Sequence, residues 1–275
     1  MGFWNEKLMK GLVVAALLGA VANASAGTLY IAADTEDFAR TLPDRLGVWN
    51  VTGATVNSSS IINTPFFLNG LADADGKLLT GTPSANTLRY VSFAGADLGS
   101  FAASGIPNGG CCNEEMLYVP TPTGVKFYHA HYADVIAELD AAGDLVQSFD
   151  QTDVVGMALV GDDIWISKWG GRSVGIWDPA TNVYTSKFTT PTNAGGLAYD
   201  PVADIMWVGR QGGTVTPYSL TGVVLGASFQ PFGNIPDTID GLTFLGEVTK
   251  VPEPSSLALM GLSLAALGLR RRRRG

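Results

Sequence analysis

Residues 196–229 read GLAYDPVADIMWVGRQGGTVTPYSLTGVVLGASF and carry the clearest fold signal in the chain. Four short apolar or alternating runs lie at residues 196–199, 205–208, 214–220 and 224–229. Turn-forming pairs separate them, because proline fixes φ and glycine tolerates positive φ. The pairs are Asp200-Pro201, Gly212-Gly213 and Thr221-Gly222. The pattern predicts a sheet of four short antiparallel strands.

The same unit recurs upstream with a period of about 40 residues. The preceding copy places its four runs at residues 156–160, 164–167, 173–177 and 184–188. Weaker copies occupy residues 116–149 and 70–101, and residues 28–60 supply runs for a copy that lacks its innermost strand. Four strands in each period of 40 to 45 residues are typical of a β-propeller blade.

The two ends of the repeated region complement each other. Residues 241–245 repeat the innermost run of a blade with no further run after it. If this run pairs with residues 29–32, strands from both ends close the ring and no sheet edge stays open. We therefore expect an all-β propeller of five four-stranded blades, or six if residues 28–69 contain another. A β-sandwich is the alternative fold, and it gives no reason for a 40-residue period.

Composition limits the class of protein. With 275 residues, 46% of them hydrophobic, the chain is too long for a disulfide miniprotein and too apolar for a disordered protein. The net charge of −8 becomes −14 without the first 26 and last six residues, because the remainder has 10 basic and 24 acidic side chains. We therefore expect no nucleic-acid binding, which depends on basic groups that displace counterions.

The first 26 residues have the three parts of a secretory signal peptide. Two lysines precede an apolar run at residues 12–22, which is shorter than the ~20 residues of a membrane-spanning helix. Ala24 and Ala26 stand at the small-residue positions that signal peptidase requires. We expect a helical signal peptide that is cleaved before Gly27, and an exported body.

Residues 251–275 form a second targeting signal. Pro252-Glu253-Pro254 precedes an uncharged run at residues 255–269, which we expect to form a hydrophobic helix in the membrane before processing. A basic cluster ends the run and stays in the cytoplasm, which places the acidic body outside. The cluster consists of Arg270, Arg271, Arg272, Arg273 and Arg274.

This combination resembles the PEP-CTERM sorting signal of Gram-negative bacteria. The resemblance implies that a membrane-embedded exosortase acts near Pro252-Glu253-Pro254, after signal peptidase has acted at the other end. It also implies an inner-membrane-anchored precursor that continues to the cell surface or extracellular matrix, a route often associated with exopolysaccharide. The expected domains are the signal peptide at residues 1–26, the propeller at 27–248 and the sorting signal at 249–275.

His129 and His131 are the only histidines, and their i, i+2 spacing puts both imidazoles on one face of a strand. Together with Glu114 or Glu115 they are candidate ligands of a divalent metal, the one cofactor that the sequence suggests. A complete site needs three or four ligands, so the alternative is a pair of hydrogen-bonding histidines on a blade face.

Cys111 and Cys112 are the only cysteines. An exported chain allows them to form a disulfide, either within the pair or to another chain. The alternative is a structural or reduced pair with no role in binding.

Trp169 and Arg172 in one blade, and Arg210 at the equivalent loop of the next, form a candidate ligand rim. An aromatic ring and guanidinium groups can stack on and hydrogen-bond a sugar or peptide. The alternative is that Trp169 packs between blades. The sequence has no nucleophile, phosphate-loop or zinc-protease motif, so no catalytic residue is assigned.

We therefore expect a surface- or matrix-directed binding or structural protein rather than an enzyme, one that presents propeller loops to a polysaccharide or surface protein or serves as a structural component of the matrix. The body resembles YVTN, NHL and SMP-30-like propellers over roughly residues 110–246, in its Gly-φ-Ala-φ-Asp and φ-Trp-φ patterns. The alternative function is an extracellular metal-dependent hydrolase or lactonase. It requires His129 or His131 to converge with carboxylates.

Replacement of Pro252, Glu253 and Pro254 by alanine tests the sorting signal. We expect the variant to accumulate as an uncut precursor in the membrane fraction, because the processing enzyme loses its recognition sequence. Intact-mass measurement of protein from cells and from medium reports both cleavage events. Release of the variant in normal amount and at normal mass would contradict the assignment.

Overall fold

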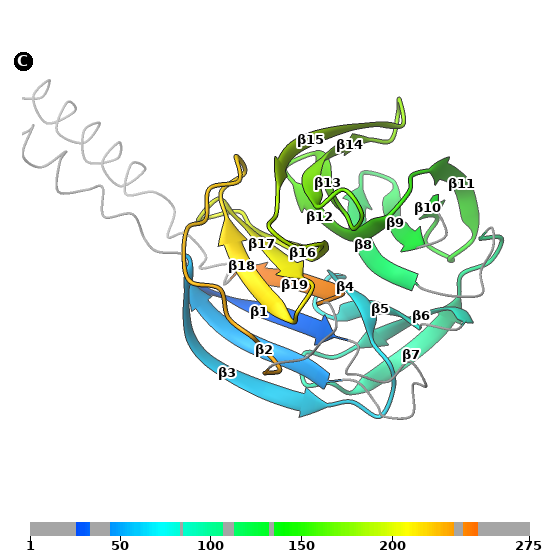
Figure 1. Cartoon of the computed structure of the whole chain (residues 1–275). Helices are drawn as coiled ribbons and strands as arrows, with labels where there is room; N and C mark the ends of the chain where they lie inside the picture. The colour runs from blue at the N-terminus through cyan, green and yellow to red at the C-terminus, as the bar shows by residue number, and fades with distance from the viewer. Residues whose placement is uncertain are drawn as a thin grey trace, which may run out of the picture.

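The computed structural model describes residues 26–33, 45–82, 85–106, 113–131, 135–233 and 239–246. All regular secondary structure in these residues is β-strand, arranged as five antiparallel sheets around a common axis (Figure 1). The expected five-bladed propeller is confirmed. No helix in the described part is long and apolar enough to span a membrane. Both expected terminal helices, and the processing residues Ala24 and Pro252-Glu253-Pro254, lie outside the described residues.

The strands of each blade follow one another from the axis outward. Blade 1 consists of β19 (Gly241–Gly246), β1 (Ala26–Ala33), β2 (Arg45–Thr52) and β3 (Thr55–Asn63). Blade 2 consists of β4 (Asn69–Asp73), β5 (Leu78–Thr82), β6 (Ala85–Val91) and β7 (Asp97–Ala102). Blade 3 consists of β8 (Asn113–Thr121), β9 (Gly124–His131), β10 (Val135–Leu139) and β11 (Leu145–Asp150). Blade 4 consists of β12 (Val154–Val160), β13 (Asp163–Lys168), β14 (Ser173–Asp178) and β15 (Val183–Thr189). Blade 5 consists of β16 (Ala194–Asp200), β17 (Ile205–Arg210) and β18 (Thr214–Tyr218).

The outermost segment of blade 5 is the irregular part of the repeat. The strand expected at residues 224–229 is present only at its ends, where Val224 bridges to Tyr218 and Phe229 bridges to Val215. Between these bridges Pro217 accepts a hydrogen bond from the amide of Leu225 at 3.0 Å. Proline has no N–H to donate in return, so the ladder is interrupted here.

Strands from both ends of the chain close the ring, as the sequence predicts. β1 pairs antiparallel with β19, so that Leu29 lies opposite Phe244 and Ile31 lies opposite Leu242. The other edge of β1 pairs with β2. Leu29, Ile31 and Leu242 are buried in one cluster between blades 1 and 5. This blade therefore joins the first and last described strands in a single sheet.

The hydrophobic core lies between the blades rather than at the axis alone. Trp165, Trp177 and Trp207 are buried in these interfaces, as their alternation within strands predicts. Tyr128 of blade 3 meets Trp177 of blade 4 edge to face, with ring centroids 5.7 Å apart. Each sheet thus packs one face against the preceding blade and the other against the following blade.

Neighbouring blades touch backbone to backbone at the start of the inner strands. A Cβ atom built on Gly241 would lie 2.8 Å from the carbonyl carbon of Gly70, and one built on Gly156 would lie 2.3 Å from the carbonyl oxygen of Gly195. Both distances are too short for a side chain. Gly70, Gly156, Gly196 and Gly241 occupy this position in four of the blades, and Glu115 occupies it in blade 3.

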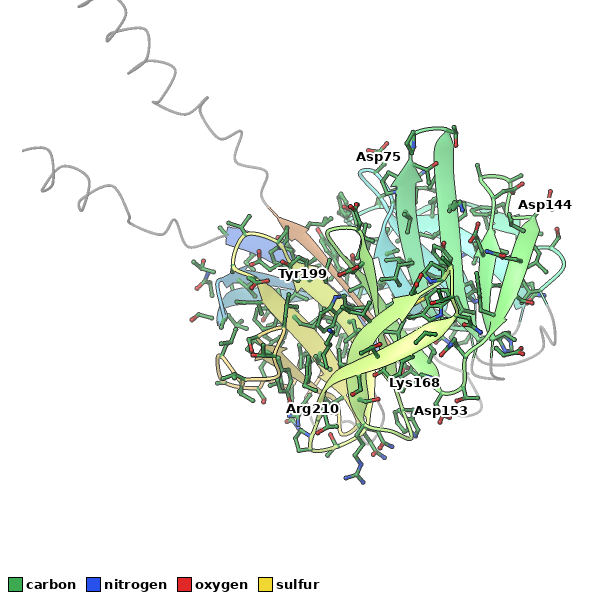
Figure 2. All side chains as sticks on the ribbon, turned by 90° about the horizontal axis from the view of Figure 1, so that it is seen from above. Asp75, Asp144, Asp153, Lys168, Tyr199 and Arg210 are labelled. Carbon is green, nitrogen blue, oxygen red and sulfur yellow. The ribbon has the colours of Figure 1, made fainter. Side chains whose placement is uncertain are left out.

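The ring has two faces, which differ in their connections. The exit face is the end at which β1 begins and β19 ends, and it carries the turns at residues 74–77, 161–162 and 201–204. The loop face is the opposite end, with the connections at residues 169–172 and 211–213. Figure 2 shows Asp75 and Asp144 at one end of the molecule and Lys168, Asp153 and Arg210 at the other.

The close approach at the axis predicts a steep cost for any side chain on Gly241. We expect Gly241→Ala to lower the free energy of unfolding by about 1–3 kcal/mol, because the methyl group must push β19 away from β4. Gly246→Ala in the same strand is the matched control, since the nearest atom to its new Cβ would be 3.5 Å away on the Phe244 ring. Equal denaturation midpoints for the two variants would contradict this account.

Candidate functional site

The three rim residues lie on the loop face in adjacent blades. Trp169 and Arg172 belong to the turn between β13 and β14, and Arg210 ends β17. Asn193 joins the two loops. Its backbone carbonyl accepts a hydrogen bond from the amide of Gln211 at 3.0 Å. With its side-chain amide turned to the orientation that satisfies both ends, its side-chain oxygen accepts a hydrogen bond from Trp169 Nε1 at 3.0 Å. The structure therefore connects the two loops that the sequence repeat aligns.

Neither rim guanidinium group has partners for all of its N–H donors within the described protein. Arg172 is exposed, and its Nη1 donates to the carbonyl of Pro191 at 3.3 Å. Arg210 Nη2 donates to Ser228 Oγ at 3.4 Å, while its Nε has no hydrogen-bond partner among the described residues. Trp169 is partly exposed, unlike the buried Trp165 and Trp207. Because Arg210 Nε is buried, the rim offers an aromatic edge beside the terminal guanidinium nitrogens of the exposed Arg172 and the partly exposed Arg210.

Charge is distributed unequally between the two faces. On the exit side, Lys126 Nζ lies 2.7 Å from Glu138 Oε1 and Arg89 pairs with Asp97, while Lys77 Nζ lies 3.5 Å from the centroid of the Tyr90 ring. The exit face otherwise carries a series of aspartates, and the loop face carries most of the remaining described cations. The aspartates are Asp73, Asp75, Asp140, Asp144, Asp162, Asp163, Asp178 and Asp204, and the cations are Arg45, Lys168, Arg172 and Arg210. The loop face also carries Asp150, Asp153 and Asp240, and Asp153 lies against the rim loop, where a Cβ atom built on Gly170 would be 2.9 Å from its Oδ2. The loop face is therefore the less acidic of the two faces.

The two histidines lie side by side near the end of β9. Their ring centroids are 6.3 Å apart and the ring planes are almost perpendicular. Both side chains are buried, and His129 lies opposite Met116 in β8. Within the described ranges, no group of three or more His, Cys, Asp or Glu side chains could hold a metal ion. Cys111, Cys112 and the side chain of Glu114 lie outside these ranges, so the expected metal site and disulfide stay predictions.

Burial keeps His129 neutral. Loss of hydration lowers the pKa of His129 to about 3, with a smaller contribution from His131. Neither ring nitrogen of His129 has a hydrogen-bond partner among the described residues. The pKa of His131 is also lowered by burial. In this form His129 acts as an uncharged part of the blade 3 interior.

Glu115 places a carboxyl group at the propeller axis. Its Oε1 accepts hydrogen bonds from the backbone amides of Leu71 at 2.7 Å and Met116 at 2.9 Å. Oε2 has no hydrogen-bond partner in the described structure, and the side chain is completely buried. Burial raises the pKa of this carboxyl well above its usual range, while the backbone amides of Met116 and Leu71 oppose the shift.

A small axial cavity of about 140 Å³ lies next to the Glu115 position along the inner strands. Three consecutive residues from each inner strand line it, starting one position after Glu115 and its four glycine counterparts. The lining residues are 71–73, 116–118, 157–159, 197–199 and 242–244. The sequence marks Glu115 as a candidate metal ligand, but its contacts are to the inner-strand amides. A sequence signal for this role does exist: Glu115 stands at the repeat position that glycine occupies in the other four blades.

Comparison with known proteins supports both the sorting signal and the fold. Residues 250–273 match the PEP-CTERM protein-sorting motif. The motif indicates an exported protein with a C-terminal membrane-anchoring signal that is processed by an exosortase. No curated protein matches the sequence.

The body is similar in fold to a chain in the "Crystal structure of Nidogen/Laminin Complex". The TM-score is 0.52 at 11% sequence identity, and the alignment covers 80% of this chain and 98% of that chain. At this identity the likeness shows a propeller fold alone. It does not distinguish the YVTN, NHL and SMP-30-like subfamilies.

The lowered pKa of His129 predicts a loss of stability in acid. The unfolded chain binds a proton at this imidazole near pH 6.5, whereas folded His129 stays neutral down to about pH 3. The free energy of unfolding therefore falls as the pH drops from about 6.5 towards 3. By pH 4 the loss should approach about 3 kcal/mol. Denaturation of wild type and His129→Leu at pH 7, 5.5 and 4 measures it. Because Glu115 is present in both proteins, its opposite pH-dependent contribution cancels when their free energies of unfolding are subtracted. Equal pH dependences of the two proteins would disprove a buried neutral His129.

Proposed function

We propose that the protein is an exported binding protein, directed to the cell surface or matrix, that presents its loop face to an extracellular polysaccharide. The rim of Trp169, Arg172 and Arg210 carries the proposal, because Asn193 links the two loops of adjacent blades into one surface. The sorting motif supports the destination, since such motifs accompany proteins that pass through the membrane to the surface.

The chemistry of the rim favours an acidic polysaccharide. Guanidinium groups bind carboxylates through paired N–H donors, and an indole edge stacks on the apolar face of a sugar ring. The exit face would repel the same polymer, because aspartates dominate it. A polyanion would therefore contact one face of the disc and leave the other free.

The metal-dependent hydrolase or lactonase is the competing function. Its candidate centre is the His129 and His131 pair, and both imidazoles are buried rather than open to a substrate-sized cleft. Metal analysis of the purified mature protein separates the two functions. A stoichiometric metal that is lost in His129→Ala would favour the hydrolase, whereas wild-type protein without bound metal would remove it.

Arginine substitutions at the rim test the polysaccharide proposal. We expect Arg172→Ala and Arg210→Ala each to weaken binding to the producing organism's acidic exopolysaccharide by about tenfold, since a hydrogen bond to a charged group contributes roughly 1.5–3 kcal/mol. Lys77→Ala is the matched control, because it removes a partly exposed charge from the β4–β5 turn on the exit face, at the opposite end of the disc from the rim.

Calorimetry or a sedimentation assay at low and high salt measures the effect. Affinity should fall as salt rises, and Trp169→Ala should weaken binding even at high salt because stacking is not screened. Equal losses in the rim variants and in Lys77→Ala would show that binding depends on net charge only and would refute the rim.

A further inference from the structure

The position of the chain ends limits how far the exit face can lie from the membrane before processing. β1 begins at Ala26 and β19 ends at Gly246, both on the exit face of blade 1. The uncharged run starts at residue 255, and nine residues of fully extended chain cover at most about 32 Å. In the anchored precursor this segment keeps the exit-face end of β19 within about 32 Å of the membrane.

Blade 5 carries a concentration of exposed aliphatic side chains on this face. They lie in two turns, one between β16 and β17 and the other directly after β18. The two turns cap the same sheet about two strand spacings apart, which is roughly 10 Å. The side chains and their exposed fractions are Val202 at 64%, Val223 at 59%, Val224 at 55% and Leu225 at 44%. These four residues are termed the blade 5 patch.

The blade 5 patch adjoins the point at which the chain leaves the propeller. Ala203, next to Val202 in the chain, packs on the buried cluster that contains Phe244 near the end of β19. On the other side of the patch, a Cβ atom built on Gly226 would lie 2.6 Å from the carbonyl oxygen of Ala54 in blade 1. Figure 1 shows β18 and the segment after it beside β1 and β2.

Blades 2 to 4 do not offer a comparable surface. Each exposes one large aliphatic side chain near the equivalent corner, with an aspartate within two residues in the chain or opposite it in the ladder. Leu98 follows Asp97, Val146 lies two residues after Asp144, and Val183 lies opposite Asp178 in the β14–β15 ladder. Val202 has Asp200 and Asp204 at the same separation, so the distinguishing part of the patch is the run from Val223 to Leu225, which lies in a stretch without charged residues at 211–233. A negatively charged lipid surface repels these corners, whereas exposed aliphatic groups gain from burial in the interface.

We propose that the blade 5 patch is a lipid-contact surface of the membrane-anchored precursor. With the C-terminal segment in the bilayer, blade 5 rests on the lipid interface and the aspartate-rich corners of blades 2 to 4 tilt away from it. The loop face then points away from the membrane. This orientation rests on the anchoring signal and on the position of Gly246, and it is independent of what the rim binds.

Site-directed spin labels test the orientation in the uncut full chain. Cys111 and Cys112 are replaced by serine, and the protein is reconstituted in vesicles of phosphatidylcholine with phosphatidylglycerol. Single cysteines at Val223 and Val202 report on the patch. Val183→Cys is the matched control, because Val183 is 55% exposed at the equivalent corner of blade 4. Circular dichroism verifies that each labelled protein keeps the wild-type β-sheet spectrum.

For each label, the measured quantity is the ratio of its accessibility to dissolved oxygen to its accessibility to a water-soluble nickel complex. We expect this ratio to be severalfold higher for the labels at 223 and 202 than for the label at 183. Val223→Asp combined with Val224→Asp should move the label at 202 into water while the anchor stays inserted. Equal ratios at 223 and 183 would overturn the proposal. Dipolar coupling between labels at 223 on two copies would also overturn it, since the patch would then be a self-association surface.

Discussion

The contact between the backbones of neighbouring inner strands is the constraint on which the propeller depends. Glycine at the facing position lets the neighbouring inner strands approach this closely in four of the blades. The short separation brings the inner-strand amides close to the axis. Blade faces then lie near enough for aromatic pairs such as Tyr128 and Trp177 to fill the wedge between sheets.

Glu115 shows what the same constraint does when the pattern changes. Blade 3 has a long side chain where the other blades have none, and the carboxyl turns toward the axis and accepts the Leu71 and Met116 amides. Buried backbone N–H groups need a hydrogen-bond partner, and the carboxyl oxygen supplies one for both amides. Burial of the acid costs free energy, and the hydrogen bonds to backbone donors offset part of that cost.

The period of the sequence is sufficient to predict the blades, since alternation, turn pairs and aromatic phase all repeat. It also predicts the closure by β1 and β19, because the first copy lacks an innermost strand and the last copy consists of an innermost strand alone. Sequence cannot predict the interrupted ladder at Pro217 in blade 5, where a single missing donor outweighs the apolar pattern. The bridge through Asn193 is equally hard to predict, because a polar residue in a connection gives no periodic signal.

The closing blade has a consequence for biogenesis. β19 is among the last strands to be synthesised, yet it forms the innermost position of the sheet that begins with β1. The N-terminal strands must therefore remain unclosed until almost the entire body has crossed the membrane. Such distant pairing is slow relative to local hairpins, so the nascent chain exposes unpaired backbone for the duration of its translocation.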